Sequence, residues 1–472
     1  MTLLLYLILL PFIAGLAAFA LPKNNQRKIL LVGVALIHLM VTLALWNPGV
    51  SPTAAVGFLE LDVLGKLVLS VISILFAAVS VYLWEYLKDE GSSNRIFTGC
   101  LLLLLSSMTL VTASVHMGLL WVALEATTLM SAPLISFERS RQSTEAAWKY
   151  ILICSVGIAL ALLGTIMLAI SSGSLKTVFL SDLLAHAGQL TPSWLKLSMV
   201  FLLIGYGTKM GLAPMHTWKP DTYAQAPAPI GGLMSGALTA CPILAILRLI
   251  QICNRAGLSS FIGSILMLMG VLSLGVAAVF MLRQKDFSRL LAYSSVENMG
   301  IIALGLGLGQ AAYWPSLFHL INNALTKGFM FMLVGDLYQH YRSKDIDRIQ
   351  GAGKSMMIGA LLILGFMSLT GIPPLGTFFS EIMILTAAIQ SKHYLTAVLF
   401  VLFLSVIFIG MAQAVLQMFH QGPASKSEPQ TITGAWSRAT ILVMGVLILG
   451  LGLYIPSFMG NILRSTQAAL GG

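Results

Sequence analysis

Residues 205–238 read GYGTKMGLAPMHTWKPDTYAQAPAPIGGLMSGAL, and this stretch decides how the whole chain folds. It begins as an apolar helix that carries a single lysine, Lys209, and it is then interrupted by Gly211 and Pro214. Proline removes a backbone donor and clashes with the preceding turn, so the helix must break here. Inside a membrane, a broken helix survives only where protein or a wet cavity surrounds it, and a charge beside the break is a candidate ion site.

The composition of the chain indicates a membrane protein. Of its 472 residues, 57% are hydrophobic and 9% are charged, whereas roughly a quarter of the residues of a soluble protein are charged. Apolar runs recur along the whole length, and a run of about 20 residues crosses the hydrocarbon layer as a helix. We therefore predict an all-α polytopic membrane protein. The net charge of +10 is attributed to basic loops on the cytoplasmic side, and not to nucleic-acid binding.

The apolar runs predict about 14 transmembrane segments. Their approximate cores are 2–21, 28–46, 62–84, 96–114, 116–136, 146–171, 194–213, 228–252, 259–281, 288–309, 313–338, 355–390, 395–420 and 438–459. Segment 12 is a second broken helix, because it contains GIPPLG at residues 371–376. Most Lys and Arg residues lie in the loops that join each odd-numbered segment to the next. The positive-inside bias then places both termini outside the cytoplasm.

The positions of the two broken segments predict an internal repeat. Segments 7 and 12 are five apart, and broken segments at matching positions of two halves are typical of repeated transporter folds. Because five is odd, the second unit enters the membrane from the opposite side, so the two five-helix repeats are inverted. We divide the chain into helices 1–3 (1–95), a first repeat of helices 4–8 (96–252), a second repeat of helices 9–13 (259–420) and a C-terminal helix 14 (421–472).

Ionisable side chains inside the apolar runs are few, and each costs roughly 3 kcal/mol or more if it stands alone at mid-bilayer. His319, Asn323 and Lys327 recur every four residues, so they share one helix face about 12 Å long. Histidine exchanges protons near neutral pH, and a neighbouring carboxylate decides whether a buried lysine stays charged. We therefore predict a proton relay. Its candidate residues are Glu125, Lys209, His319, Lys327 and Glu381, with Glu297 and Asn323 as further candidates.

Each of these candidates also has a plainer interpretation. Glu125 and Lys209 are compatible with a buried structural ion pair. His319 is compatible with a single hydrogen bond to a neighbouring helix. Glu297 lies about two turns from the start of segment 10, where it is compatible with a partly hydrated position of no special role.

Segment 8 lacks an ionisable group in its middle. Ser235 and Thr239 are the polar side chains there, and neither holds a proton at neutral pH. Water must then connect Lys209 with the face of segment 11, and water stays only where two to four polar partners hold it. We expect one hydrated path lined by Ser235, Thr239, His319 and Asn323.

The four cysteines lie inside or at the ends of apolar runs and form no CxxC pair. They are Cys100, Cys154, Cys241 and Cys253. The sequence therefore gives no basis for a disulfide framework, a zinc site or an iron–sulfur cluster, and we expect no cofactor in this chain.

Five motifs around the candidate residues resemble one known family. They are LEATTL, TKMGLAPMHTWKPDTYAQAPAPI, RLLAYSSVENMG, HLINNALTKGFMFML and GIPPLGTFFSEI. The chain resembles the antiporter-like subunits shared by respiratory complex I, Mrp sodium/proton antiporters and membrane-bound group 4 hydrogenases. PMHTWKPD, the glutamate of SSVENMG and TKGFMFMLVGDLYQHYRSKDIDRIQG are similar to the F-type membrane subunit of hydrogenase 4 and formate hydrogenlyase-like complexes.

The resemblance implies a proton-translocating membrane subunit of a multisubunit redox complex in a bacterial or archaeal cytoplasmic membrane. Electron transfer in a peripheral arm would drive protons along Glu125, Lys209, Lys327 and Glu381. Nickel–iron and iron–sulfur centres would belong to partner subunits, so whether this chain counts as part of an enzyme depends on those partners. The other partners implied are neighbouring membrane subunits, the lipid bilayer and the transported ion, which is the proton or, in one alternative, sodium.

Two departures from the family pattern keep other functions open. The family usually has a lysine or histidine in the middle of segment 8, and it often has a second histidine where Asn323 stands. One alternative is an Mrp-type subunit that exchanges sodium for protons without a redox arm. The other is a structural membrane anchor in which the relay is inactive.

Overall fold

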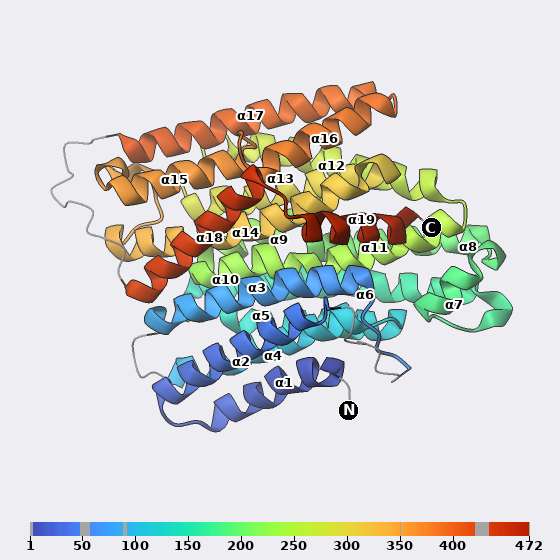
Figure 1. The fold of residues 1–472 in the computed structure, drawn as a ribbon, viewed down its shortest axis with the longest axis horizontal. Coiled ribbons are helices and arrows are strands. Elements are labelled where there is room, and N and C mark those ends of the chain that lie inside the picture. Colours follow the sequence, from blue (N-terminus) through green and yellow to red (C-terminus); the bar gives the residue numbers. More distant parts are fainter. Residues whose placement is uncertain (1–2, 48–56, 88–91, 350, 421–433, 472) are drawn as a thin grey trace.

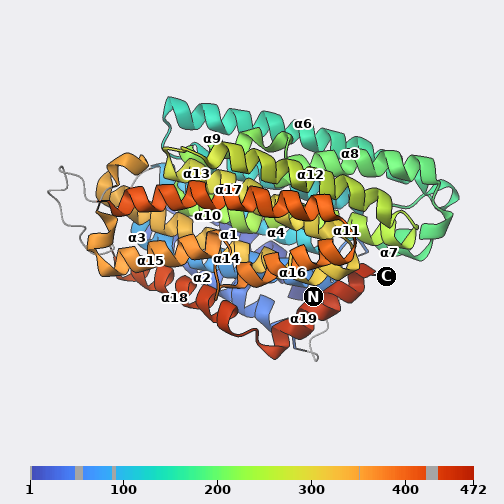
Figure 2. The ribbon, with the colours of Figure 1, turned by 90° about the horizontal axis from the view of Figure 1, so that it is seen from above.

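The structure is a computed structural model that describes residues 3–47, 57–87, 92–349, 351–420 and 434–471. Its helices form one elongated bundle, and most of them run along the longest axis of the molecule (Figure 1). Both termini lie toward the same end of the bundle in two perpendicular views (Figure 1 and Figure 2). Residues 421–433, where the predicted C-terminal segment begins, lie outside the described residues.

The first six predicted segments correspond to six helices. They are α1 (Leu3–Ala20), α2 (Asn24–Ala44), α3 (Val63–Tyr86), α4 (Ser92–Ala113), α5 (Met117–Ile135) and α6 (Arg141–Ser171). Segments 7 and 8 are each composed of several helical pieces. These are α8 (Pro192–Met210) and α9 (Trp218–Gln225), followed by α10 (Ala228–Leu233), the π-helical turn η4 (Met234–Leu238) and α11 (Thr239–Arg255). A short helix, α7 (Leu180–Ala185), precedes α8.

The second half continues with three long helices, a broken one and two more. They are α12 (Ser259–Met281), α13 (Phe287–Gly307), α14 (Gln310–Tyr341), the halves α15 (Met356–Leu369) and α16 (Gly376–Gln390), α17 (Tyr394–Phe419) and α18 (Ala435–Leu453). Among the described residues, 13 spans are long and apolar enough to cross a membrane. The α15–α16 pair adds the broken segment 12. The predicted all-α polytopic fold is therefore confirmed.

A final helix, α19 (Ser457–Gly471), was not anticipated by the sequence analysis. It is amphipathic, with Leu463 and Leu470 buried against the bundle. Its C-terminal carbonyls accept hydrogen bonds from the end of α11: Gln251 Nε2 donates to Ala469 O at 2.9 Å and Asn254 Nδ2 to Leu470 O at 2.8 Å. The last predicted segment, which ran to residue 459, therefore merged the end of α18 with the start of a separate surface helix.

Segment 7 breaks at Gly211, which adopts the left-handed region with φ 79°. The backbone groups that the break releases are hydrogen-bonded by the protein. Ala213 N–H donates to Ser273 Oγ of α12 at 2.9 Å, and the Trp218 indole donates to Thr208 O at 2.9 Å. Such pairing is what allows an irregular backbone at membrane depth.

Segment 12 breaks in the same way at Gly371, where φ is 59°. The Thr377 hydroxyl donates to Ser368 O at 2.8 Å, and this carbonyl stands three residues before the glycine, as that of Thr208 does in segment 7. The two breaks read GLAPMHTWKPD (211–221) and GIPPLGTFFSE (371–381), with glycine, proline, threonine, an aromatic residue and an acid at equal spacing. This correspondence supports the predicted repeat of segments 4–8 and 9–13.

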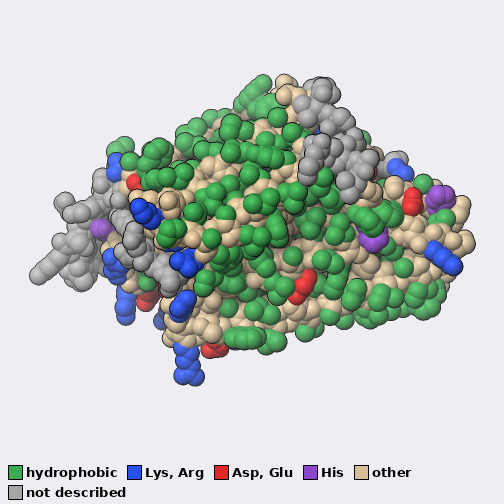
Figure 3. All heavy atoms as spheres, turned by 90° about the horizontal axis from the view of Figure 1, so that it is seen from below, with side chains coloured by type: hydrophobic (Ala, Val, Ile, Leu, Met, Phe, Trp, Pro, Cys, Tyr) green, Lys and Arg blue, Asp and Glu red, His purple; other side chains and the backbone are tan. Residues whose placement is uncertain are grey.

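The bundle has a buried centre and an apolar outer face. The segment formed by α10, η4 and α11 is buried along its length, and so is most of α14. Large hydrophobic side chains on the outer helices are exposed, among them Val279 at 68% and Leu395 at 73%. Hydrophobic side chains cover the middle of the surface seen in Figure 3, and Lys and Arg side chains gather mainly toward one end. A lipid layer around the middle of the bundle would cover these exposed apolar groups.

Candidate functional site

The first group of candidate residues surrounds Lys209 at the end of α8. Its side chain is 2% exposed, and its Nζ donates to Thr128 Oγ1 at 2.7 Å and to Tyr150 OH at 2.8 Å. Thr128 donates to Glu125 Oε2 at 3.3 Å, and Ser155 donates to Glu125 Oε1 at 2.8 Å. A hydroxyl therefore stands between the ammonium and the carboxylate, and the direct ion pair that the sequence left open is not formed.

The second group surrounds Lys327 on α14. Its side chain is fully buried, and its Nζ donates to Ser294 Oγ at 2.7 Å and to Leu291 O at 3.3 Å, both on α13. Ser294 Oγ also accepts a hydrogen bond from Asn298 Nδ2 at 3.3 Å. Lys327 therefore enters a hydrogen-bonded series that follows α13.

The same series continues through His319 to segment 12. His319 Nε2 lies 2.9 Å from Asn298 Oδ1, and His319 Nδ1 lies 2.8 Å from Ser380 Oγ on α16. An amide oxygen only accepts, so Nε2 carries a hydrogen. Ser380 has a second acceptor in Thr377 O at 2.7 Å. Its hydroxyl can therefore donate to neutral His319, or turn to Thr377 and accept from His319 once the ring is doubly protonated.

This geometry contradicts two of the plainer interpretations, those of His319 and Glu297. His319 makes two side-chain hydrogen bonds to different helices, and not a single one. Glu297 is 1% exposed, so it is not a partly hydrated surface group. Its Oε2 has no hydrogen-bond partner among the described residues. Asn323 is also 1% exposed, and both polar atoms of its amide lack a partner in the described part of the chain.

The polar residues of segment 8 make different contacts from those expected of a shared path. Ser235 lies in the π-helical turn, and its hydroxyl bonds to the Ser295 hydroxyl on α13, next to the Ser294 that holds Lys327. Thr239 donates to Ser235 O of its own helix at 2.6 Å. The structure thus brings Ser235 to the Lys327 group, whereas the Thr239 hydroxyl is engaged by its own backbone.

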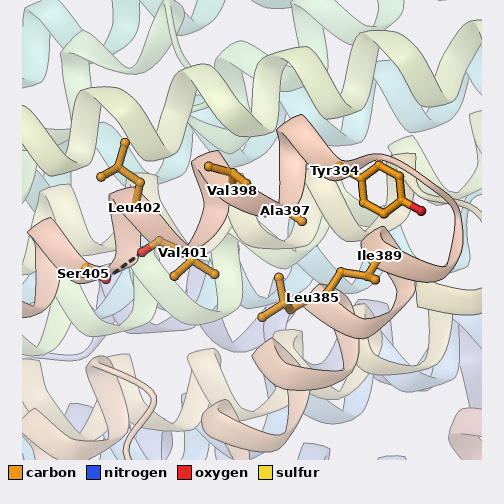
Figure 4. Close-up of a pocket in the computed structure, with 8 residues that line it drawn as sticks. All are labelled: Leu385, Ile389, Tyr394, Ala397, Val398, Val401, Leu402 and Ser405. Carbon is orange, nitrogen blue, oxygen red and sulfur yellow. Dashed lines mark hydrogen bonds between the residues drawn. The ribbon is translucent and has the colours of Figure 1, made fainter.

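Glu381 is the next residue after Ser380 on α16 and is 9% exposed. Its carboxylate lies against Gly371, where a Cβ would come within 2.1 Å of Oε2. Glu381 lines a cavity of about 490 Å³ together with Gly371 and residues of α16 and α17. Beside it lies an apolar groove of about 670 Å³ between the same helices (Figure 4). The Ser405 hydroxyl in that groove donates to Val401 O of its own helix at 2.8 Å, so the groove offers no free polar group from this residue.

The residues that link the charged candidates were not singled out from the sequence. They are hydroxyl, phenol and amide groups, namely Thr128, Tyr150, Ser155, Ser294, Asn298 and Ser380. Lys219 on α9 is fully buried, and it was not among the candidates predicted from the sequence. Its signal was available, because Lys219 lies in the same broken segment as Lys209 and carries a charge.

Metal-binding chemistry finds no support in the described residues. They contain no group of three or more His, Cys, Asp or Glu side chains that could hold a metal ion. The four cysteines are buried, free thiols. The amine, imidazole and hydroxyl groups of the site are of the kinds that accept and donate protons in hydrogen bonds.

Comparison with known proteins places this arrangement in a family. The family described as "NADH:quinone oxidoreductase/Mrp antiporter, TM" matches residues 114–408. The hydrogenase-4 component F homolog of Methylacidiphilum infernorum (isolate V4) is 34% identical over 374 residues, which cover 77% of each chain. The NADH-quinone oxidoreductase subunit N of Halorhodospira halophila (strain DSM 244 / SL1) is 27% identical over 459 residues, 95% of this chain and 93% of that one.

A solved structure agrees at the level of the fold. The structure of the membrane-bound sulfane sulfur reductase (MBS), an archaeal respiratory membrane complex, contains a chain that matches with a TM-score of 0.88 at 23% identity. The match covers 99% of this chain and 97% of the other. The matched family region includes every candidate residue from Glu125 to Glu381. The chain belongs to the NADH:quinone oxidoreductase/Mrp antiporter transmembrane family.

Proposed function

We propose that this chain is the proton-translocating membrane subunit of a multisubunit redox complex of the hydrogenase 4 or complex I type. Protons pass along two buried groups, one around Glu125 and Lys209 and the other around Lys327 and His319, and reach Glu381. Electron transfer in partner subunits drives the movement. This chain holds no redox centre of its own.

The observation that carries the proposal is the buried series Lys327, Ser294, Asn298, His319 and Ser380. Consecutive members are joined by contacts of 2.7, 3.3, 2.9 and 2.8 Å. A purely structural network has no need of a lysine and a histidine among its members, because buried charges are costly unless they are paired. Lys327, His319 and the neighbouring carboxylates can each hold a proton, whereas the Asn298 amide only orients His319, so a proton crosses between the ionisable groups through water beside the amide.

Protonation of His319 and rotation of the Ser380 hydroxyl supply the movement at this end of the series. A proton that arrives at His319 turns Nδ1 into a donor, and the Ser380 hydroxyl rotates toward Thr377 O. When His319 releases this proton to a water that carries it toward Glu381, its Nδ1 becomes an acceptor again and the Ser380 hydroxyl can turn back to donate to it. A charge on Glu297 or Glu381 favours charged Lys327 or His319, so a change of either carboxylate changes where the proton rests.

We further propose that the chain lies in a bacterial or archaeal cytoplasmic membrane with both termini outside the cytoplasm. Most Lys and Arg residues lie in the loops that join each odd-numbered segment to the next, and this charge distribution supports the orientation. The two termini also lie at the same end of the bundle (Figure 1). A cysteine at position 343 tests it on a background that lacks the four native cysteines. Labelling of Ser343→Cys from the cytoplasmic face is expected, and labelling from the outer face would reject the orientation.

The experiment that tests the function begins with purification from the native membrane and identification of the co-purifying subunits. The complex is then reconstituted in vesicles, and proton uptake during redox turnover is followed with a pH-sensitive dye. Glu125→Gln and Lys209→Ala should each largely abolish uptake while the complex still assembles. Lys196→Ala, an exposed lysine of the same segment 7, is the matched control and should behave as wild type.

Other outcomes of this experiment separate the alternatives. Wild-type uptake in both Glu125→Gln and Lys209→Ala would refute the proposed relay. Partners without redox centres, together with proton movement that requires sodium, would assign an Mrp-type exchanger. Redox partners with no proton uptake in the wild-type complex would assign a structural anchor.

A further inference from the structure

Lys219 is a buried amine that the relay described above leaves unused. It lies on α9, just beyond the break in segment 7, and its side chain is 0% exposed. Its Nζ has no hydrogen-bond partner within the described ranges. An isolated charge in hydrocarbon costs roughly 3 kcal/mol or more, so a buried lysine without a partner indicates a functional role.

The break in segment 7 is built around this lysine. A Cβ on Gly211 would lie 2.1 Å from Lys219 Cε and 2.8 Å from Nζ, so the amine rests directly against the glycine backbone. Segment 12 has the same arrangement, because a Cβ on Gly371 would lie 2.1 Å from Glu381 Oε2. In each broken segment an ionisable side chain from the second half therefore covers the left-handed glycine.

Lys219 lies between the two candidate groups. Helix α9 packs against α6 of the first group on one side and against α13 of the second group on the other. Asp221 of α9 forms ion pairs with both neighbouring helices, with Lys149 of α6 at 3.1 Å and with Arg289 of α13. The amine lies within electrostatic range of Lys327 and of Cys154, and Cys154 is within range of Lys209 as well.

Aromatic rings lie between Lys209, Lys219 and α14. Lys209 Nζ lies 4.9 Å from the centre of the Tyr150 ring, and the Tyr150 and Trp218 rings are 5.0 Å apart. Lys219 Nζ is 5.9 Å from the Trp218 ring. From Trp218, contacts at 6.0 and 5.7 Å lead through Tyr223 to Phe331, one helical turn beyond Lys327 on α14.

Unpaired polar atoms gather along this part of the chain. Within the described residues, buried side-chain atoms without a hydrogen-bond partner include four from one short stretch, His216 Nδ1, Lys219 Nζ, Thr222 Oγ1 and Tyr223 OH. Each would cost about 1–3 kcal/mol if it stayed dry. Clustered polar groups of this kind are what holds buried water in proteins.

We propose that Lys219 is the central relay group that passes protons between the Lys209 group and the Lys327 group. The inference rests on the proposed function and deepens it, because segment 8 of this chain has no lysine, histidine or carboxylate in its middle to do that work. Charged Lys219 releases one proton through water toward the Lys327 group and becomes a neutral amine. It then accepts one proton from the Lys209 group, so the cycle leaves its own protonation unchanged.

The test compares two substitutions in the complete complex, reconstituted as above. Lys219→Met keeps most of the length of the side chain but cannot hold a proton, and it should lower proton uptake at least tenfold. Lys219→His can hold a proton but binds it more weakly than lysine does. It should retain uptake, with the alkaline limit of the pH profile moved to lower pH. Lys196→Ala is the control and should match the wild type.

The outcomes separate this inference from the function on which it rests. If Lys219→Met pumps normally while Lys209→Ala does not, Lys219 is no relay group, although the proposed function stands. If neither substitution matters, the proposed function fails first. Loss of uptake in both Lys219→Met and Lys219→His assigns a structural role and overturns the inference. Should Lys219→Met fail to assemble, Lys219→His decides alone, and an unchanged pH profile would count against the relay.

Discussion

Asn298 is the group whose replacement tests the buried series most directly. Its amide oxygen lies 2.9 Å from His319 Nε2, and its nitrogen lies 2.6 Å from Ser294 O and 3.3 Å from Ser294 Oγ. Asn298→Leu keeps a side chain of similar size but removes both the acceptor and the donor. Lys327 and His319 would then be separated by an apolar group.

The structure gives a magnitude for this change. His319 Nε2 loses its partner in a site that is 0% exposed, and an orphaned buried donor costs about 1–3 kcal/mol. Each 1.36 kcal/mol is a factor of ten in rate, so proton transfer along the series should slow by about 5- to 150-fold. Asn298→Ala should be milder, because the space it opens is lined by His319 and Ser294 and can admit a water.

The assay is dye-monitored proton uptake by vesicles that contain the purified complex, normalised to the amount of assembled complex. Asn322→Ala is the matched control, because its amide donates to Phe318 O of its own helix at 2.8 Å and connects no two charged groups. Normal uptake by Asn298→Leu would refute the series as a proton path. An equal loss in Asn322→Ala would show that the effect comes from packing.

Three further predictions follow from other parts of the structure. Ser235→Leu should block uptake by drying the contact between segment 8 and α13, whereas Ser235→Ala should be mild, and normal uptake by the leucine variant would place the path elsewhere. Gly211→Ala should reproduce the loss seen in Lys219→Met because the new Cβ displaces the amine. Gly257→Ala, at φ 70° with no atom within 4 Å, carries the same backbone strain without the clash and should pump normally. Arg248 of α11 is fully buried and donates to Ser114 O and Thr112 O. Arg248→Met should lower the melting temperature of the complex, since about 1–3 kcal/mol is lost for each of these carbonyls left unpaired, and uptake per assembled complex should stay unchanged.

The arrangement of the membrane segments follows from the sequence because the bilayer restricts what the chain can do. Backbone groups must be satisfied inside each segment, so apolar length alone marks the helices. Both breaks were predictable for the same reason, since Pro214 and the Pro373–Pro374 pair cannot continue a helix. Helix α19 was missed because an amphipathic helix on the surface has no such signature, and its carbonyls are held by Gln251 and Asn254 from a distant segment.

The charged members of the candidate site were equally visible in the sequence, because an ion in an apolar run is conspicuous. Their connectors were not. Ser294, Asn298 and Ser380 are ordinary residues for a membrane helix, and only the packing of α13, α14 and α16 brings them into one series. Thr239 shows the converse, since its hydroxyl is as polar as that of Ser235 but turns to its own backbone.

The two breaks place their ionisable groups differently, and in the proposed function this difference gives the two groups different roles. Lys219 is fully buried between α6 and α13, so it exchanges protons with groups inside the bundle. Glu381 is 9% exposed and lines the cavity between α16 and α17 at the surface. The same kind of bend therefore holds a buried amine in segment 7 and a carboxylate that lines a cavity in segment 12. In the proposed function, a proton that reaches Glu381 leaves this chain through the cavity between α16 and α17, which requires a partner subunit or water in place of lipid over that cavity.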